Sequence, residues 1–378
     1  MIRQTFAHVD LGALADNVRA IRAFLAAGRG GAAPPVLVGV VKANAYGHGA
    51  SEVARTLIGA GAGMLACADI EEALALRADG LTCPILVFGT LSLGDLDGVF
   101  EHGLTPTISS PTAGRAMQLA AARRGVRVRY HLEIDTGMNR LGFRHDNLPR
   151  TMPDLLAAPN LELAGVYTHF ATADTPGDEL FARQRRHFDA ARQQLLALGV
   201  RTFKRHAANS AALLADSSTW FDLVRPGLLL YGVSPPALEG RVVVTPVMSL
   251  RSRVVAVKGV RPGEIIGYGA RFTAERATTT AIVPAGYADG LDTRLAGRGW
   301  VLVRGRRAPI VGSVCMDMIM IDVTGFAVEP GDEVVITGSQ GGDEIRVGEM
   351  ARWVGTIPYE LLCRVGARVE RRYNSPGL

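Results

Sequence analysis

Several residues able to do covalent or acid–base chemistry stand close after short apolar runs of this sequence. Lys42 follows the run at 36–41 and opens the stretch Lys-Ala-Asn-Ala-Tyr-Gly-His-Gly. Four more polar residues follow later apolar runs in the same way: Arg140, His169, Ser210 and Arg225. Alone, each is more often a solvated strand end, a structural histidine or a turn arginine. Their repeated position indicates one shared site.

The apolar runs alternate with helical patterns from residue 10 to about residue 233, as expected for parallel β-α-β units. Eight strands are expected, at 36–41, 64–68, 84–88, 105–108, 126–134, 163–168, 203–206 and 223–224. The clearest helices are expected at 11–27, 70–78, 112–124 and 178–198. Eight such repeats predict a closed (β/α)8 barrel of the TIM type, while periodicity alone leaves an open sheet as the alternative. In a barrel, the polar residues would meet at the carboxyl ends of the strands, where reactive loops lie.

The pattern changes around Gly-Val-Ser-Pro-Pro at 232–236. Beyond it, β-branched segments separated by Gly and Pro turns predict a mainly β domain. Its strands are expected at 252–257, 278–283, 300–303, 319–323 and 333–337, with one short helix at 347–354. The predicted fold class is therefore α/β plus β, with the barrel over 10–235 and the β domain over 236–378.

The composition is that of a folded globular protein, since 48% of the 378 residues are hydrophobic and 20% are charged. The net charge is +5, but Arg and Lys are spread along the chain, so we expect solvated faces and no nucleic-acid partner. No apolar run reaches the roughly 18 residues of a membrane span, and the N-terminus has no apolar signal core. The four cysteines are scattered without metal-ligand spacing. We therefore expect a cytoplasmic protein with no disulfide framework, no metal and no membrane segment.

A lysine at the end of an apolar strand has a particular chemical use. Apolar surroundings remove solvation from the ammonium and lower its pKa, and the neutral amine can form a Schiff base with an aldehyde. Pyridoxal 5′-phosphate (PLP) is the commonest aldehyde partner of such a lysine. Its phosphate needs hydroxyls and backbone N–H groups, which Tyr46, Ser210, Gly227 and Leu228 can supply.

Eight short motifs resemble those of alanine racemases, and they run in order from near residue 40 to near residue 360. The stretch at 41–49, which contains Lys42, resembles the PLP-lysine signature of that family. The other motifs are Arg-Leu-Gly at 140–142, Asn-Ser at 209–210, Arg-Pro-Gly at 225–227, Gly-Tyr-Gly at 267–269, Gly-Tyr-Ala-Asp-Gly at 286–290, Cys-Met-Asp at 315–317 and Ile-Pro-Tyr at 357–359. The resemblance therefore covers both predicted domains.

The resemblance implies a fold-type III PLP enzyme that interconverts L-alanine and D-alanine and supplies D-alanine for peptidoglycan. It also implies that residues 1–9 join the β domain. Within the barrel, Lys42 would bind PLP covalently, and Arg225 would meet the pyridine nitrogen. His169 would bond to Arg225, while Arg140 would bond the phenolic oxygen of PLP and help orient substrate. The phosphate would be held by Tyr46, Ser210, Gly227, Leu228 and Tyr359, and Asn209 would be a further cofactor-binding residue.

The resemblance further implies a head-to-tail homodimer with composite active sites. The partner subunit would supply Tyr268 as a second base, the amide of Met316 for the substrate carboxylate, and Tyr287 to narrow the entrance. Racemisation removes a proton from one face of Cα and returns one on the other, so bases such as Lys42 and Tyr268 must flank a planar intermediate. The ordinary pKa of tyrosine is about 10, so Tyr268 needs positive charge nearby to act at neutral pH.

Glu133 stands where the family often has a lysine that is carbamylated in its structures. A carbamylated lysine carries negative charge, as a glutamate does at neutral pH. Glu133 is therefore expected to support Arg140 by charge, and the alternative is a partly solvated strand residue without a role.

Three other functions are compatible with parts of this pattern. A non-catalytic PLP-binding protein shares the barrel and the early lysine, but it is a single barrel. A fold-type III decarboxylase shares the architecture, but it typically has an acidic residue where Arg225 stands. A broader-specificity amino-acid racemase of the same superfamily differs mainly in the width of its entrance. The expected function remains an alanine racemase, with the broader racemase as the alternative.

Overall fold

The computed structural model describes residues 4–89 and 96–374. The described chain divides into two compact units. The barrel unit comprises Leu14–Ala45 and Ala50–Val244. The β unit contains the residues up to Ala13, the short segment Tyr46–Gly49 and the residues from Thr245 onward.

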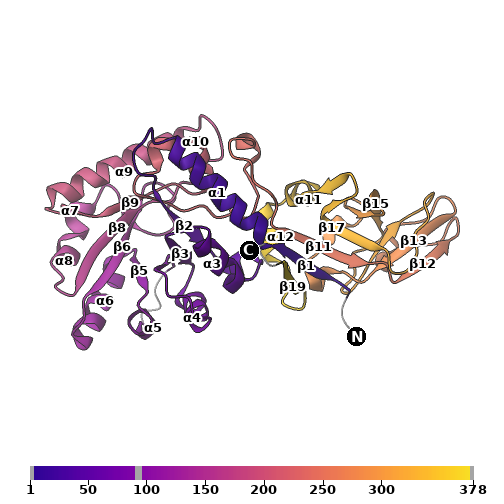
Figure 1. Cartoon of the computed structure of the whole chain (residues 1–378), viewed down its shortest axis with the longest axis horizontal. Coiled ribbons are helices and arrows are strands. Elements are labelled where there is room, and N and C mark those ends of the chain that lie inside the picture. Colours follow the sequence, from indigo (N-terminus) through magenta and orange to yellow (C-terminus); the bar gives the residue numbers. More distant parts are fainter. Residues whose placement is uncertain (1–3, 90–95, 375–378) are drawn as a thin grey trace. The chain divides into compact units, whose positions relative to one another are not determined.

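Within the described residues, eight parallel strands of the barrel unit form a closed ring (Figure 1). The ring closes because β10 pairs with β2 and β5 pairs with β6. β7 (Phe143–Arg144) is an additional strand that pairs with β6. The barrel strands are β2 (Val36–Val40), β3 (Met64–Cys67), β4 (Ile85–Val87), β5 (Thr105–Ile108), β6 (Val128–Asp135), β8 (Leu161–Tyr167), β9 (Lys204–His206) and β10 (Leu223–Val224).

The helices of the barrel unit begin and end at residues suited to those positions. The side chain of Ser110 accepts a hydrogen bond from Ala113 N–H at the start of α6, and Gly125 ends that helix in the left-handed conformation. Asp178 caps the longest of them, α9, which buries Phe188 and Leu195. These helices are α1 (Leu11–Ala27), α2 (Lys42–Tyr46), α3 (Ala50–Gly59), α4 (Ile70–Ala78), α5 (Asp97–Glu101), α6 (Pro111–Arg124), α7 (Leu148–Thr151), α8 (Pro153–Leu156), α9 (Glu179–Ala197) and α10 (Ser210–Ala215).

The β unit is built on one mainly antiparallel sheet. Its described strands follow the order β12 (Ala256–Val260), β13 (Thr278–Val283), β16 (Ile319–Asp322), β15 (Arg306–Val311), β14 (Trp300–Val303), β17 (Glu333–Gln340), β11 (Met248–Arg253), β1 (Phe6–Asp10) and β19 (Glu370–Asn374). β18 (Asp343–Ile345) pairs with β17. The N-terminal strand β1 thus lies between β11 and the C-terminal strand β19, with which it runs parallel. The helices α11 (Val347–Val354) and α12 (Pro358–Cys363) complete the unit.

The predicted barrel and the mainly β domain are confirmed, and the open-sheet alternative is wrong. Each of the eight expected barrel strands overlaps an observed one. In the β domain, the single strand expected at 252–257 is wrong, because β11 ends at Arg253 and β12 begins at Ala256. The chain changes partner strand there: Val254 N–H bonds to Asp332 and Val255 N–H bonds to Ile282. The sequence also failed to predict β15, β19 and α12, and it counted one helix in place of two.

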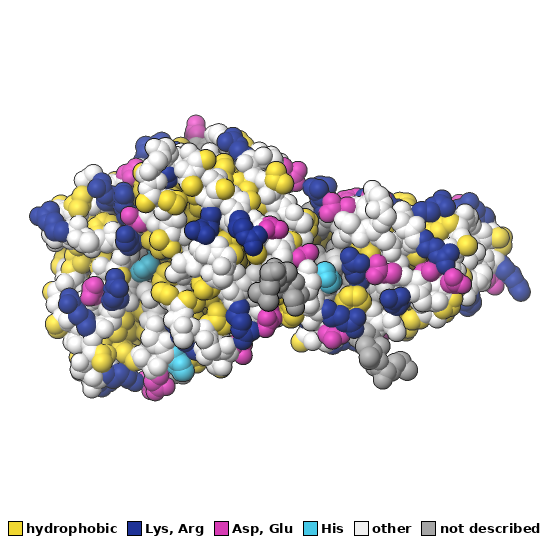
Figure 2. All heavy atoms as spheres, in the orientation of Figure 1, with side chains coloured by type: hydrophobic (Ala, Val, Ile, Leu, Met, Phe, Trp, Pro, Cys, Tyr) yellow, Lys and Arg dark blue, Asp and Glu magenta, His cyan; other side chains and the backbone are white. Residues whose placement is uncertain are grey.

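No helix among the described residues is both long enough and apolar enough to cross a membrane. On the face shown in Figure 2, Lys and Arg side chains are dispersed and interleaved with Asp and Glu. Many charged side chains among the described residues form ion pairs, as Arg304 does with Glu329 and Asp332.

Candidate active site

Lys42 follows β2 and begins a turn of unusual backbone conformation. Ala43, Asn44, Ala45 and Tyr46 all have φ between 52° and 53°, in the left-handed region. Each non-glycine residue in that region costs roughly 1–2 kcal/mol, so the surroundings must hold the turn in place. Ala45 N–H bonds to Val41 O at 2.8 Å, and Ala43 N–H bonds to Glu72 Oε1 at 2.5 Å.

The guanidinium of Arg225 is the most deeply buried charge among the predicted site residues, with 3% of the residue exposed. Nη1 donates to His206 Nδ1 at 2.8 Å, and Nη2 donates to Thr168 O at 2.8 Å and to Ala207 O at 3.1 Å. His169 Nδ1 lies 3.4 Å from Nη2. Burial lowers the pKa of Arg225 to about 10 against the influence of Tyr167 and Glu133, so the side chain stays charged at neutral pH.

His206 extends the hydrogen bonding of Arg225 into the barrel. Arginine can only donate, so Nδ1 of His206 accepts, and its Nε2–H is left to donate to His131 Nδ1 at 2.8 Å. Burial and the charge of Arg225 lower the pKa of His131 to about 4 and the pKa of His206 well below its ordinary value. Both rings are therefore neutral at physiological pH. Tyr167 stacks on His206, with 4.7 Å between ring centroids.

His169 lies close enough to Lys42, Arg140 and Arg225 for their positive charges to affect its pKa. Burial, together with the positive charges of Arg225, Arg140 and Lys42, lowers its pKa to about 3. An imidazole surrounded in this way stays neutral, so it can bond to Arg225 without adding charge. The structure thus brings Lys42, Arg140 and Arg225 within electrostatic range of His169.

Ser210 and the turn after β10 form a small set of polar groups. Ser210 Oγ accepts from Gly227 N–H at 2.9 Å and from Leu229 N–H at 3.3 Å. Because both bonds use the oxygen as acceptor, the hydroxyl proton remains available to donate to an anion. Asn209 caps α10 through a bond from Ala212 N–H at 2.9 Å, which fixes the backbone beside Ser210. Leu228 belongs to the same turn and is buried.

Two predicted phosphate-binding tyrosines form a pair within the β unit. The ring centroids of Tyr46 and Tyr359 are 6.0 Å apart. Tyr359 is the second residue of α12 and is partly exposed.

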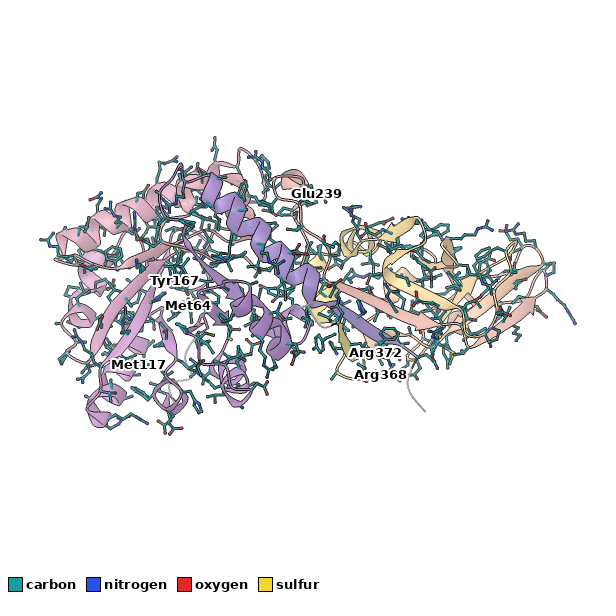
Figure 3. All side chains as sticks on the ribbon, viewed as in Figure 1. Met64, Met117, Tyr167, Glu239, Arg368 and Arg372 are labelled. Carbon is teal, nitrogen blue, oxygen red and sulfur yellow. The ribbon has the colours of Figure 1, made fainter. Side chains whose placement is uncertain are left out.

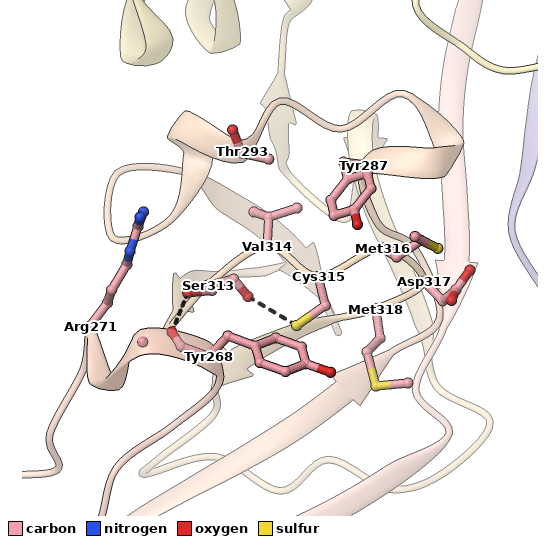
Figure 4. Close-up of a pocket in the computed structure, with 11 residues that line it drawn as sticks. Tyr268, Arg271, Tyr287, Thr293, Ser313, Val314, Cys315, Met316, Asp317 and Met318 are labelled. Atoms are coloured by element: carbon pink, nitrogen blue, oxygen red, sulfur yellow. Dashed lines mark hydrogen bonds between the residues drawn. The ribbon is translucent and has the colours of Figure 1, made fainter.

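The three residues predicted to serve a partner subunit share one hollow of the β unit, about 740 Å³ in volume (Figure 4). Tyr268 is 77% exposed, and Met316 and Tyr287 are also exposed. Ser313 Oγ donates to Tyr268 O at 2.7 Å, which fixes the turn that carries this tyrosine.

The Tyr287 turn is packed directly on the Met316 loop. A Cβ on Gly286 would lie 2.3 Å from Met316 O, so only glycine permits the approach. Tyr287 N–H bonds to Cys315 O at 3.0 Å. Arg368, which Figure 3 labels in the C-terminal part of the chain, donates to both carboxylate oxygens of Asp289 and to Met316 O.

The predicted residues therefore occur in two groups, one in each unit. The barrel unit holds Lys42, Arg140, His169, Asn209, Ser210, Arg225, Gly227 and Leu228, and the β unit holds Tyr46, Tyr268, Tyr287, Met316 and Tyr359. The interpretation of Glu133 as a solvated strand residue is wrong, because only 5% of it is exposed. Its carboxyl group hydrogen-bonds to Tyr167. Burial raises the pKa of Glu133, while the charges of Arg140 and Arg225 lower it.

No role was predicted from the sequence for His131, His206 or Tyr167, the last of which is labelled in Figure 3. A signal was present for His131, because it and Glu133 stand two residues apart in β6 and point to the same side of a strand that is buried along most of its length. Two polar residues on one face of a barrel strand indicate an interior polar cluster. His206 is the last residue of the short polar strand β9, and its partners lie on other strands or beyond them.

Comparison with known proteins identifies the family. Residues 9–235 match the N-terminal domain of alanine racemase, and residues 247–373 match the C-terminal domain. A relative from Symbiobacterium thermophilum, named alanine racemase, is 41% identical over 98% of this chain and 97% of its own. A second from Desulforamulus reducens, also named alanine racemase, is 41% identical over 97% of this chain and 98% of its own.

Solved structures agree with these matches. The alanine racemase of Bacillus anthracis, solved with bound L-Ala-P, is 37% identical, has a TM-score of 0.91, and is matched over 100% of this chain and 97% of its own. The enzyme from the D-cycloserine producer Streptomyces lavendulae is 36% identical, also with a TM-score of 0.91, over 100% of this chain and 98% of its own.

A barrel with a lysine and two arginines at its mouth, followed by a β domain, defines an amino-acid isomerase of the racemase class. Both units match one family over nearly their whole length. The chain belongs to the alanine racemase family. The single-barrel PLP-binding protein and the decarboxylase are thereby excluded as alternatives.

The lowered pKa values of the buried histidines lead to a prediction of how the free energy of unfolding depends on pH. In an unfolded chain histidine has a pKa of about 6.5, whereas in the folded protein the pKa of His131 is about 4 and that of His169 about 3. Between these values the unfolded chain binds more protons, so stability rises with pH by up to about 1.4 kcal/mol per unit for each histidine. We expect the melting temperature to fall as pH is lowered from about 7 to about 5, and to fall less steeply in His131→Gln. Equal slopes for variant and wild type would contradict this.

The charge of Glu133 leads to a second prediction, which concerns catalysis. We expect Glu133→Gln to lower kcat or raise the KM for alanine about threefold to tenfold, because the charge that faces Arg140 is removed while the shape is kept. Melting temperature and the spectrum of bound cofactor should change little. Arg140→Lys should give a similar defect, and the double variant should resemble either single variant. Glu162→Gln, on the exposed face of the neighbouring strand, is the matched control. A kinetically silent Glu133→Gln would show that its charge has no role.

Proposed function

We propose that this protein interconverts L-alanine and D-alanine with PLP bound covalently to Lys42. The observation that carries the proposal is the setting of Arg225. Its described hydrogen bonds all go to neutral acceptors, namely main-chain carbonyls and imidazole nitrogens. Such an arginine offers a permanent positive charge to a ring nitrogen but will not give up its proton.

The residues of the barrel mouth fit the chemical groups of PLP. When bound, PLP would draw electrons from the substrate Cα and make its proton acidic. Lys42 would bind the aldehyde carbon. Arg225, held in place by its Nη hydrogen bonds, would meet the pyridine nitrogen. Arg140 would bond the phenolic oxygen.

The phosphate would be bound by hydroxyls and backbone N–H groups. In the barrel unit, the support for this is the spare hydroxyl proton of Ser210 and the fixed turn next to it. In the β unit, the support is the closeness of the two phenol rings. The proposed phosphate ligands are Tyr46, Ser210, Gly227, Leu228 and Tyr359, with Asn209 as a further cofactor-binding residue.

Lys42 and Tyr268 would move protons on opposite faces of Cα. Arg225 would make this possible in two ways. With His169, it would supply the positive charge that a tyrosine base such as Tyr268 needs. It would also leave the pyridine ring a weaker electron sink than a protonated ring would be, which would limit side reactions. His206 and His131 would keep Arg225 in place without competing for its charge.

Tyr268, Tyr287 and Met316 would act on a partner's barrel in a head-to-tail homodimer. The support is their exposure in one hollow of a single chain. The Met316 amide would bind the substrate carboxylate, and Tyr287 would narrow the entrance. By membership of this family, the protein would work in the cytoplasm and supply D-alanine for peptidoglycan.

Chirally resolved turnover of a panel of L-amino acids tests the activity. We expect alanine to be racemised at least about tenfold more efficiently than serine or larger amino acids, because the hollow would be narrowed by Tyr287. Borohydride reduction should fix PLP on Lys42. Comparable turnover across the panel would favour the broader racemase, and an adduct on Lys204 or Lys258 would refute the role of Lys42.

Mixing two inactive variants tests the composite site. Lys42→Ala and Tyr268→Phe should each be inactive as pure dimers. Random exchange makes half of the dimers hybrid, and each hybrid keeps one site with both residues intact, so about one quarter of wild-type activity should return. Mass-tagged subunits would verify the exchange. Absence of recovery after verified exchange would mean that each site lies within one chain.

A further inference from the structure

The C-terminal strand of the β unit binds the backbone of the loop that follows Lys42. Arg371 Nε donates to Gly47 O at 3.0 Å, and the Tyr373 hydroxyl donates to His48 O at 3.3 Å. The loop also packs against α12, because a Cβ on Gly47 would lie 2.3 Å from Leu362 O. These contacts join segments more than 300 residues apart in sequence.

The two Nη atoms of Arg371 bind backbone carbonyls of a second segment, which follows α12. Nη1 donates to Gly366 O at 2.6 Å and to Val369 O at 2.8 Å, and Nη2 donates to Val365 O at 2.6 Å. These carbonyls belong to the segment that leaves α12, the helix that carries Tyr359. One guanidinium therefore fixes the position of the Lys42 loop relative to the segment after α12.

All four described acceptors of Arg371 are main-chain carbonyls. An arginine in an ion pair can be replaced by another cation, but one that binds several carbonyls depends on the planar fork of N–H donors. The half-buried guanidinium has lost part of its hydration, which lowers its pKa, and the carbonyls compensate for that loss. The contacts of Arg371 thus favour a role in setting backbone geometry.

Tyr46 is the residue whose position depends most on this geometry. It precedes Gly47 and is the last non-glycine residue of the left-handed run, with φ of 52°. A strained backbone relaxes unless surrounding contacts hold it. Release of Gly47 would therefore let Tyr46 move away from Tyr359, whose ring is 6.0 Å distant.

We propose that Arg371, assisted by Tyr373, is a positioning residue for the phosphate end of the cofactor site, where it keeps the hydroxyls of Tyr46 and Tyr359 close enough to bind one phosphate group. This inference rests on the proposed function, because it requires that PLP is the cofactor. It goes further by assigning to the end of the chain a selective effect on phosphate affinity.

Comparison of PLP with pyridoxal, which lacks the phosphate, tests the inference. Apoenzymes of the wild type, Arg371→Met and Arg371→Lys would be titrated with each compound, and Kd would be read from the absorbance of the lysine adduct. We expect Arg371→Met to raise the Kd for PLP at least about tenfold and the Kd for pyridoxal less than about twofold. Arg371→Lys should be intermediate, because a single ammonium can satisfy only some of the carbonyls.

Arg372→Met is the matched control, because it removes an arginine from the next position of the same strand. The Arg372 guanidinium pairs with Glu370 and lies 4.1 Å from the ring centroid of Phe6, away from the loop contacts described for Arg371. We expect its Kd for both compounds to match that of the wild type. If Arg371→Met does not fold, Tyr373→Phe, which removes only one hydroxyl, should still weaken PLP more than pyridoxal.

Two results would overturn the inference: an unchanged Kd for PLP in the Arg371 variants, or an equal loss for PLP and pyridoxal, which would indicate a general effect on folding. Failure of the proposed function looks different. In that case the wild-type protein itself would form no PLP adduct on Lys42, and the inference would fail with it.

Discussion

The buried guanidinium of Arg225 is the constraint on which the barrel mouth depends. Moving a charge out of water is unfavourable unless hydrogen bonds replace the lost hydration. Here the replacements are the carbonyls of Thr168 and Ala207 and the ring nitrogen of His206. These acceptors lie at the ends of two neighbouring strands, β8 and β9, so the closed barrel is what makes the burial of the charge possible.

The positive charge of Arg225 also determines the states of the groups around it. It helps to keep His131, His169 and His206 neutral, because each has a lowered pKa. It acts in the opposite direction on Glu133, where it favours the carboxylate against the effect of burial. The result is a mouth that holds fixed positive charge with neutral imidazoles, which suits the binding of an anionic cofactor and the stabilisation of a deprotonated phenol.

The left-handed turn after Lys42 is the second constraint, and it connects the two units through the chain itself. Lys42 belongs to the barrel unit, whereas Tyr46, four residues later, belongs to the β unit. The turn is held at its start by Glu72, which accepts from Ala43 N–H and Ala68 N–H. It is held at its end by Arg371 and Tyr373. Strain in the turn is thus offset by contacts on both sides, and those contacts determine where the lysine and the tyrosine are presented.

Sequence alone was sufficient for the elements whose pattern is local. β2, β3 and β4 are continuous apolar runs because parallel strands are buried on both faces, and α1, α4 and α11 end where they were expected. The order of motifs was also enough to identify the family. The contacts of Arg371 could not be predicted, because its partner Gly47 lies 324 residues away and only the folded sheet brings them together. The same holds for the chain from His131 through His206 to Arg225, which joins three strands, and for the change of partner strand at Val254. Hydrogen bonds between distant residues depend on strand order and backbone position, which no local pattern contains; those parts of the protein were decided by the tertiary structure.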